Sequence, residues 1–292
     1  MTVSVARFLG LILLPLLLLA APAAAQFRKP KPKVLRPPET IATVSPEVVR
    51  LLAEAQALQA QYKESEALGK YEQALTLAPA TYEALWQAAV LSVRIGGRYS
   101  DETRKMAYFS TARLYASRAL VVRPQGGESN YAEALALANQ ATLLTARSRL
   151  LSCKVMQPHV FMAVQQRPEF AEAWQLLGRW HYRVDHYNIL ERIYSRVFLG
   201  GMPAGASTGA AIEALTKAHE LDPERIQFAY DLARVQLNQR HHRQAVAALQ
   251  EAVALTPVTA EELEISRRCR NLLEQLNRRL VKQLQRHTRS VE

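Results

Sequence analysis

The chain has 292 residues and a formal net charge of +11, with 49% hydrophobic, 22% charged and 7% aromatic residues. This balance excludes an intrinsically disordered chain, because there is enough apolar material for a core, and a count of two cysteines excludes a disulfide-rich scaffold. Glycine is scarce and Ala, Leu, Gln, Glu and Arg are abundant, so we expect an all-α protein.

Residues 1–25 have the composition of a secretory signal peptide. One positive charge, Arg7, precedes an apolar run over residues 8–21, and Ala23 and Ala25 supply the small residues that signal peptidase requires. We expect cleavage before Gln26 and export of the mature protein to the periplasm or the medium. An uncleaved segment would instead anchor the chain in a membrane, although the short span favours cleavage.

Two basic segments flank the predicted helical domain. Residues 26–45 are rich in Lys, Arg and Pro, which predicts an extended linker, and the C-terminal helix is dense in arginine. Such segments are either solvated surface or contacts for a membrane surface or an anionic polymer. We expect no nucleic acid as partner, because the export signal points away from it and no nucleic-acid motif accompanies the charge.

A tetratricopeptide-like helical domain is predicted over residues 46–292. Ser45 and Pro46 form an N-cap and first helical position, and residues 48–81 fit a 34-residue repeat of two helices. Its packing positions hold Leu51, Ala55, Leu58, Ala67, Tyr71 and Ala74. A second copy opens at Tyr82, but its second helix comes late, so we expect residues 96–106 to loop out.

The later repeats are unequal in clarity. Residues 128–166 are helical by pattern and contain Pro158, which suggests a degenerate helix pair. The clearest repeats are 171–225, which carries an insertion, and 226–259. A basic helix over 260–286, with Thr259 as its N-cap, should cap the array. We therefore expect an α-solenoid of about five helix pairs, with one inserted helix and a C-terminal capping helix.

The repeat at 171–225 also carries a family resemblance. It opens with Trp174, Leu177 and Gly178 in the W-x-x-L-G pattern of tetratricopeptide repeats. The run L-G-R-W at 177–180, the insertion with F-L-G-G and M-P-A-G-A-S, and A-L-x-K-A-x-E-L-D-P at 214–223 resemble the regulator of microtubule dynamics family. The resemblance covers roughly residues 124–276, and the long insertion between the two helices is its most specific mark.

The resemblance implies a helical-repeat adaptor without known catalysis, whose eukaryotic members associate with microtubules and are linked to membranes or mitochondria. In this chain a secretory signal replaces the anchoring arrangement of those members, which indicates an exported relative of bacterial type. An exported protein would not meet tubulin, so the fold carries over better than the partner does.

Motifs for phosphate, metal or cofactor chemistry are incomplete. The loop Gly200–Ser207 nearly spells a phosphate-binding loop, but Ala206 takes the place of the lysine and a helix precedes it, so we interpret it as an inter-helix turn. Seven histidines show no pair at i and i+4, and we expect no metal and no cofactor. Cys153 and Cys269 either form one disulfide or remain two buried thiols.

The inner face of the array is the candidate binding surface, because in this fold the first helix of each repeat lines the concave side. Counting from the register, its residues are basic and aromatic, which suits an acidic peptide or an exposed carboxylate. They are Trp86, Arg94, Gln175, Arg179, Tyr182, Arg183, Tyr230, Arg234 and Asn238. We assign no catalytic residues and expect a scaffold that binds protein or peptide outside the cytoplasm.

Two alternatives belong to other functional classes. One is a microtubule-associated regulator, as the resemblance implies, which requires that the N-terminus not direct export. The other is an enzyme with a site near the inserted helix, at His186, Tyr187 and Glu191. This second alternative requires that the three side chains surround a closed pocket.

Overall fold

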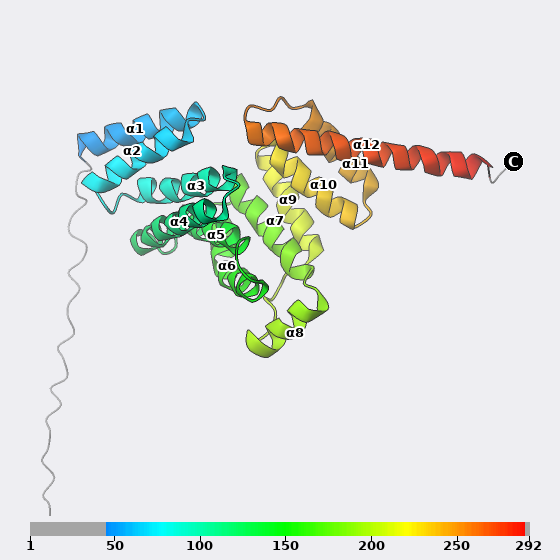
Figure 1. The fold of residues 1–292 in the computed structure, drawn as a ribbon, viewed down its shortest axis with the longest axis horizontal. Helices are drawn as coiled ribbons and strands as arrows, with labels where there is room; N and C mark the ends of the chain where they lie inside the picture. Colours follow the sequence, from blue (N-terminus) through cyan, green and yellow to red (C-terminus); the bar gives the residue numbers. More distant parts are fainter. Residues whose placement is uncertain (1–44, 290–292) are drawn as a thin grey trace, which may run out of the picture. The chain divides into compact units, whose positions relative to one another are not determined.

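The structure, a computed structural model, describes residues 45–289, with side chains as far as residue 279. The predicted signal peptide and nearly all of the predicted linker lie outside this range. The regular structure of residues 45–289 consists of twelve helices (Figure 1). They are α1 (Pro46–Ala60), α2 (Glu64–Leu77), α3 (Tyr82–Arg98), α4 (Glu102–Val122), α5 (Gly127–Ala141), α6 (Ala146–Gln166), α7 (Ala171–Asp185), α8 (Ile189–Phe198), α9 (Thr208–Leu221), α10 (Ile226–Asn238), α11 (His242–Ala254) and α12 (Ala260–Arg289).

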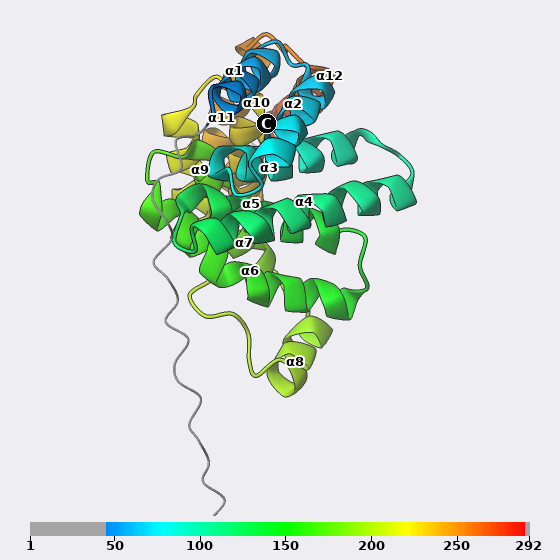
Figure 2. The ribbon, with the colours of Figure 1, turned by 90° about the vertical axis from the view of Figure 1, so that its left-hand side faces the viewer.

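Ten of these helices form five pairs, as expected for a tetratricopeptide-like α-solenoid. The pairs are α1–α2, α3–α4, α5–α6, α7–α9 and α10–α11, and each second helix also contacts the first helix of the next pair. Figure 2 shows α3, α4, α5 and α6 lying side by side. The remaining helices are the inserted α8 and the capping helix α12, which packs on α10 and α11.

The helix starts follow the chemistry predicted from the sequence. The Ser45 hydroxyl accepts a hydrogen bond from the Val48 amide, with Pro46 at the first helical position. The hydroxyl of Ser207 accepts from Ala210 at the start of α9, and that of Thr259 from Glu262 at the start of α12. These oxygens satisfy amides that have no partner within the helix.

Small residues let the paired helices approach closely. In the first pair, Ala55, Ala67, Tyr71 and Ala74 are all fully buried. Gly178 of α7 shows the limit: a Cβ at this position would lie 2.6 Å from Leu215 Cγ of α9 and 3.1 Å from a backbone carbonyl oxygen. The glycine of the W-x-x-L-G pattern is therefore required by the packing of α7 on α9.

The expected loop at residues 96–106 is wrong. α3 runs to Arg98 and α4 begins at Glu102, so the extra residues lengthen both helices of the pair. Aromatic packing supports the longer helices, because Tyr99 stacks on Tyr108 with ring centroids 5.4 Å apart. Gly96 lets Phe109 pack directly against α3, since a Cβ there would meet its ring at 3.0 Å.

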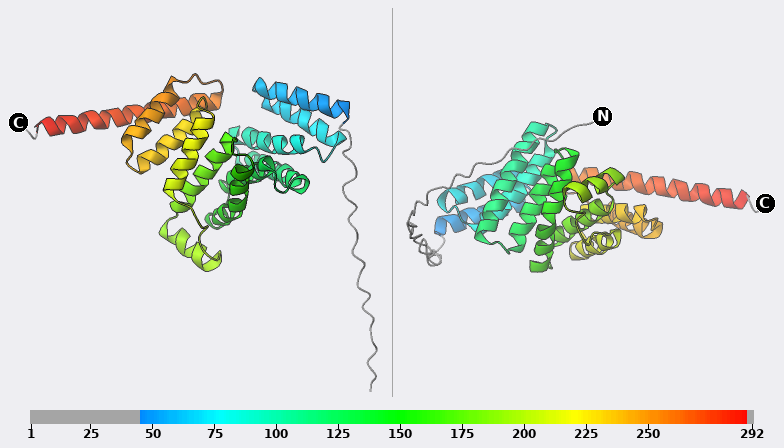
Figure 3. Two further views of the ribbon diagram at one scale, coloured as in Figure 1. Left: turned by 180° about the vertical axis from the view of Figure 1, so that it is seen from behind. Right: turned by 90° about the horizontal axis from the view of Figure 1, so that it is seen from below.

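The degenerate pair and the cap are both regular helices. Pro158 lies within α6 without ending it. α12 continues past α11 toward the C-terminus (Figure 3). Cys153, half-buried on α6, and Cys269, buried on α12, are both free thiols and belong to different clusters of the core. Among the helices of residues 45–289, none is both long and apolar enough to cross a bilayer.

Candidate functional site

Side chains of α7 and α10 meet in a polar surface that we call the α7–α10 strip. The strip consists of Gln175, Arg179 and Tyr182 on α7 and of Asp231, Arg234 and Asn238 on α10. Near its centre, the Gln175 amide donates a 2.7 Å hydrogen bond to the Asp231 carboxylate, and Arg179 Nε lies 3.7 Å from the same oxygen. Asp231 is 5% exposed, and the contacts with Gln175 and Arg179 supply polar partners for its buried carboxylate.

The strip continues to the C-terminal ends of both helices. The Asn238 amide donates a 2.8 Å hydrogen bond to the Tyr182 hydroxyl. The ring of His186 lies against that of Tyr182, with centroids 4.1 Å apart, and its Nε2 is 3.4 Å from the Asn238 oxygen. Two groups of polar contacts, one central and one terminal, therefore join α7 to α10.

Two arginines of the strip face solvent. The side chain of Arg179 is 56% exposed despite its contact with Asp231. Arg234 is exposed and places its guanidinium over the ring of Tyr230, 5.6 Å from the centroid. No salt bridge to Arg234 is found among the described residues of the chain. Both guanidiniums keep donors that an external carboxylate can use.

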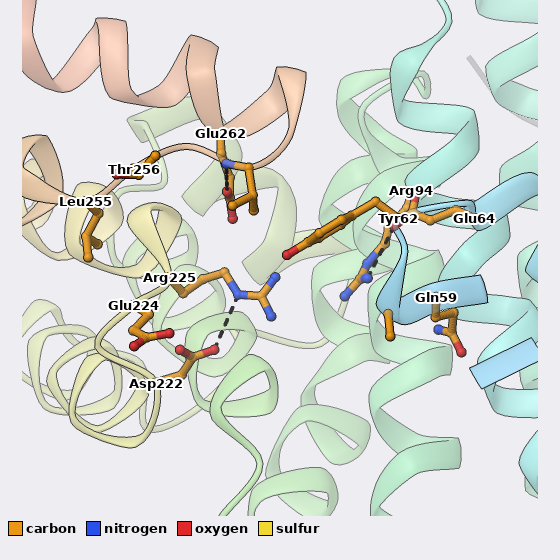
Figure 4. Close-up of a pocket in the computed structure, with 12 residues that line it drawn as sticks. Gln59, Tyr62, Glu64, Arg94, Asp222, Glu224, Arg225, Leu255, Thr256 and Glu262 are labelled. Carbon is orange, nitrogen blue, oxygen red and sulfur yellow. Dashed lines mark hydrogen bonds and ion pairs between the residues drawn. The ribbon is translucent and has the colours of Figure 1, made fainter. Parts of the chain in front are cut away.

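A pocket of about 490 Å³ lies at the other end of α7 and α10, where both helices begin. Figure 4 shows Arg94 of α3 and Arg225 before α10 pointing toward each other across it, with Tyr62 between them. Both guanidiniums form ion pairs with acidic side chains. Arg225 lies 3.4 Å from Asp222 and 3.5 Å from Glu172, and Arg94 lies 3.4 Å from Glu64.

The pocket combines residues from the first two repeats with residues on either side of the last repeat. Its lining is Gln59, Ala60, Tyr62, Glu64, Arg94, Asp222, Glu224, Arg225, Leu255, Thr256, Val258 and Glu262. Beside it, Arg98 of α3 forms ion pairs with Glu64 of α2 and with Glu261 of α12. We call these three residues the Arg98 clasp. Glu64 is only 8% exposed, and its carboxylate forms ion pairs with both Arg94 and Arg98.

Tyr62 has an uncommon backbone conformation. Its φ is 59°, in the left-handed region, and Arg240 has φ 61° in the corresponding turn of the last repeat. This conformation costs a residue with a Cβ roughly 1–2 kcal/mol relative to glycine. Tyr62 is nevertheless 56% exposed and lines the pocket, so its ring is presented to solvent.

The structure brings together most of the predicted binding residues, but not all. Gln175, Arg179, Tyr182, Tyr230, Arg234 and Asn238 lie on or beside the strip, and Arg94 lies in the pocket. Trp86 is partly buried, and its indole N–H donates to Glu83 at 3.0 Å. Arg183 turns away toward α8, where it pairs with Glu191 and covers the ring of Tyr187.

The register count missed residues with clear roles. Asp231 was overlooked because an acidic side chain on a helix normally faces solvent, yet it is buried between α7 and α10. Its spacing of three from Arg234 is a signal that could have drawn attention to it. Arg225 and Tyr62 lie in turns, outside the helical positions that a repeat register counts.

His186, Tyr187 and Glu191 make separate contacts and line neither of the two cavities described for residues 45–279. His186 contacts Tyr182 and Asn238, whereas Tyr187 is buried and Glu191 caps α8 and pairs with Arg183. A second cavity, of about 570 Å³, lies between α6 and the loop before α9 and is lined by Gln157, Pro158, Phe161, Ala204 and Gly205. Neither cavity is lined by these three side chains.

The half-buried His159 and the buried His181 have separate environments. His159 Nδ1 lies 2.8 Å from the Asn130 side-chain oxygen, and His181 packs between the rings of Phe161 and Trp180. Burial lowers the pKa of both His159 and His181 below the ordinary value of 6.5. Within residues 45–289, no three side chains of His, Cys, Asp or Glu converge as metal ligands would.

Comparison of the sequence with known protein families identifies one family. The family model described as regulator of microtubule dynamics protein 1-3 matches residues 51–277. The chain belongs to this family. The match includes the first two repeats as well as the region around the insertion, so it extends beyond the resemblance at residues 124–276.

Curated members of the family are longer than the matched region. Regulator of microtubule dynamics protein 3 of Mus musculus is 27% identical over 139 residues, which is 48% of this chain and 29% of that protein. The Bos taurus protein is 29% identical over 137 residues, 44% of this chain and 29% of the relative. The chain thus aligns with less than a third of these relatives.

A solved structure shares the fold. A thermophilic tetratricopeptide-repeat protein of Thermus thermophilus superposes with a TM-score of 0.56 at 18% identity, covering 77% of this chain and 98% of that chain. The expected fold class, an all-α solenoid of the tetratricopeptide type, is confirmed.

Proposed function

We propose that this protein is a non-catalytic scaffold that binds an acidic segment of a protein or peptide along the α7–α10 strip, outside the cytoplasm. The observation that carries the proposal is the pair of exposed guanidiniums, Arg179 and Arg234, on two helices whose relative position is fixed by polar contacts. A solenoid of the tetratricopeptide type commonly offers such a surface to partners.

Preorganisation supports this use of the strip. The hydrogen bonds from Gln175 to Asp231 and from Asn238 to Tyr182 hold the surface in place before a partner arrives. The stacking of Arg234 on Tyr230 likewise restricts a long side chain. A partner therefore loses less free energy in ordering this surface than it would on unsupported arginines.

The chemistry of the partner follows from the free donors. Guanidinium groups form paired hydrogen bonds with carboxylates, and within residues 45–279 the Arg234 guanidinium lies over the Tyr230 ring without an ion pair. The pocket beyond the strip is less selective for charge, because Arg94 and Arg225 already face acidic side chains. We therefore place recognition of acidic groups on the strip and not in the pocket.

The test is affinity capture from extract of the source cells, with the full chain as bait. Arg179→Glu combined with Arg234→Glu should remove the proteins that wild type captures, because the new carboxylates repel an acidic segment. The matched control is Arg240→Glu with Arg243→Glu, two exposed arginines at the turn between α10 and α11, which changes the net charge equally. Circular dichroism verifies that both variants remain helical. Equal capture by the two double variants would dismiss the proposed strip.

The proposed location outside the cytoplasm is supported by the sequence of residues 1–25, with Arg7, the apolar run and the small residues at 23 and 25. Fusing residues 1–40 to a reporter enzyme tests this part. Recovery of the processed reporter outside the cytoplasm is expected. A reporter that stays in the cytosol would argue against export while leaving the strip proposal open.

A second candidate function is regulation of microtubules, which the family match over residues 51–277 and the names of the relatives favour. Sedimentation with assembled microtubules at physiological ionic strength tests it directly. Binding by wild type that is lost in Arg179→Glu with Arg234→Glu, but kept in the matched control, would make the microtubule the partner of the strip. An absence of binding would leave the exported scaffold as the candidate.

A further inference from the structure

The inserted helix α8 presents its polar side to the protein. The Glu191 carboxylate pairs with Arg183 of α7 and accepts the backbone N–H of Asn188 at 2.9 Å. The Arg192 guanidinium donates to the carbonyl oxygens of Tyr187 and Asp185 at 2.8 and 3.1 Å. Ser195, 1% exposed, donates to the Gly201 carbonyl oxygen at 2.9 Å.

The apolar side of the same helix is left in solvent. Its large side chains are between 55% and 77% exposed, and they are Ile189, Leu190, Ile193, Val197 and Phe198. Positions 189, 193 and 197 are spaced by four and so share one side of a helix. Figures 1 and 2 show α8 at the edge of the array, outside the stacked pairs. A cluster of this kind marks a binding surface, whereas isolated exposed apolar residues do not.

Basic side chains border this apolar side. Arg196 belongs to α8 and is exposed, and α6 adds Arg147, Arg149 and Lys154, which are also exposed. Arg147 lies over the Tyr194 ring, 5.3 Å from its centroid, and the Lys154 ammonium reaches the Leu199 carbonyl, so both lie beside α8. The sequence of α6 contains no acidic residue, and the single acid of α8, Glu191, is neutralised by Arg183.

We propose that α8 docks this protein on the surface of a bilayer that contains anionic lipid. The apolar side of α8 enters the boundary between headgroups and acyl chains, and the arginines and lysine beside it pair with lipid phosphates. A short amphipathic helix with basic flanks suits this position. The proposal goes beyond the scaffold function, because the exposed side of α8 is not part of the α7–α10 strip.

The charges favour lipid over a second copy of the chain. Two copies meeting through α8 would bring their arginines together, and like charges oppose such a contact. An anionic bilayer instead offers acyl chains that bury the apolar side and phosphates that pair with the basic side chains beside it. We therefore treat self-association as an outcome that would overturn the proposal.

A fluorophore at α8 provides the test, because the basic linker and the apolar N-terminus could also bring the full chain to vesicles. Phe198→Cys is labelled with an environment-sensitive dye in the full chain that carries Cys153→Ser and Cys269→Ala. The matched control places the same label at Val121→Cys on α4, an 83% exposed site. Vesicles contain either neutral phosphatidylcholine alone or a mixture with phosphatidylglycerol.

With anionic vesicles, the label at 198 should report an apolar environment and the label at 121 should remain in water. Ile193→Ser with Val197→Ser should lower the α8-dependent partition by roughly ten-fold or more, since two apolar side chains no longer leave water. Arg147→Gln with Arg196→Gln should lower it by roughly 25-fold, at about five-fold per charge. Arg240→Gln with Arg243→Gln is the charge-matched control and should leave the signal at 198 unchanged.

Three outcomes would overturn the proposal. A label at 198 that stays in water on vesicles carrying the protein would mean that other segments make the contact. An equal response with neutral vesicles would remove the role of lipid charge. A response without vesicles that grows with protein concentration would assign the apolar side of α8 to contact between copies.

Discussion

Helices α7 and α8 are adjacent in the chain and both amphipathic, yet they face the protein with opposite sides. α7 buries Leu177 and Trp180 and leaves its polar residues to the strip. α8 contacts α7 through Glu191 and Arg192 and leaves its large apolar residues exposed. Amphipathic pattern alone therefore does not say which side of a helix is buried.

The two helices are stabilised by different kinds of contact. α7 is stabilised by packing against α9, where burial of each large side chain contributes about 1.5–3 kcal/mol. α8 is held by the ion pair of Glu191 with Arg183 and by hydrogen bonds of Arg192 and Lys154 to backbone carbonyls, each of which contributes less. We expect substitutions in α7 and α9 to change the stability of the whole array, and substitutions in α8 to change only local order and binding.

The largest expected effect comes from a leucine-to-alanine substitution made once in the core beneath α7 and once on the exposed side of α8. Leu215→Ala, at a fully buried leucine of α9 that packs on α7, should lower the free energy of unfolding by about 2–5 kcal/mol. Leu190→Ala, at a 77% exposed leucine of α8, should change it by less than about 0.5 kcal/mol. Urea unfolding followed by circular dichroism measures both. A large loss for Leu190→Ala would mean that α8 belongs to the core.

A smaller effect is expected from the close approach of α7 and α9. Gly178→Ala should destabilise the array by about 1–3 kcal/mol, because its Cβ would meet Leu215 Cγ at 2.6 Å. Gly209→Ala is the matched control in α9, where the nearest atom lies 3.9 Å away. The control should be neutral or stabilising by up to about 1 kcal/mol. Equal stability of the two variants in urea would show that the helices can separate without cost.

The pH dependence of stability should also differ between α7 and α8. Burial holds the pKa of His181 on α7 below 6.5, so below this pH the unfolded chain takes up a proton that the folded chain does not. Stability should therefore be complete above pH 6.5 and fall as the pH is lowered toward the folded-state pKa, by at most about 1.4 kcal/mol per pH unit.

The check is the slope of unfolding free energy between pH 7.5 and 5.5. His181→Tyr should reduce the slope, since tyrosine does not titrate in this range. His159, whose pKa burial also lowers, accounts for a remaining part. An unchanged slope in His181→Tyr would contradict the assigned role of burial.

The smallest effect is expected at the attachment of α8. The hydrogen bond from Arg183 lowers the pKa of Glu191 below its ordinary value of 4.5, so the pair contributes stability above pH 4.5 and loses it as the pH falls through the lowered pKa. The protection factors of residues 187–201 against hydrogen exchange should then fall by up to roughly ten-fold, while those of α10 stay unchanged. Glu191→Gln should show the faster exchange already at pH 7. Exchange that changes equally in α8 and α10 would indicate global unfolding instead.

The sequence was sufficient for features that repeat and insufficient for features that occur once. The five pairs, the caps at Ser45 and Thr259 and the close approach at Gly178 follow from periodic patterns and local chemistry. The loop at 96–106 was wrong because a period says where a helix recurs and not how far it can lengthen. Helical residues favour longer helices over a loop that leaves backbone groups to water.

The candidate site was predicted in part for the same reason. Arg179 and Arg234 follow from the register, because it counts positions on one side of a helix. Arg183 occupies a similar position but turns to Glu191, since the inserted α8 supplies a partner that no regular repeat has. The pocket joins residues of turns and helix ends that are far apart in sequence, from Tyr62 to Glu262, and no periodic pattern relates them.

The Arg98 clasp has a consequence for how this protein could have changed in length. A solenoid of equal repeats can grow by duplication of a unit, because each unit needs only its neighbours. Here Arg98 near the start of the array holds both Glu64 and Glu261, which belong to helices at its two ends. An added repeat would carry Glu261 away from Arg98. A duplication of one repeat would therefore lose both the Arg98 clasp and the pocket beside it. Natural selection that maintains either feature would also keep the number of repeats constant.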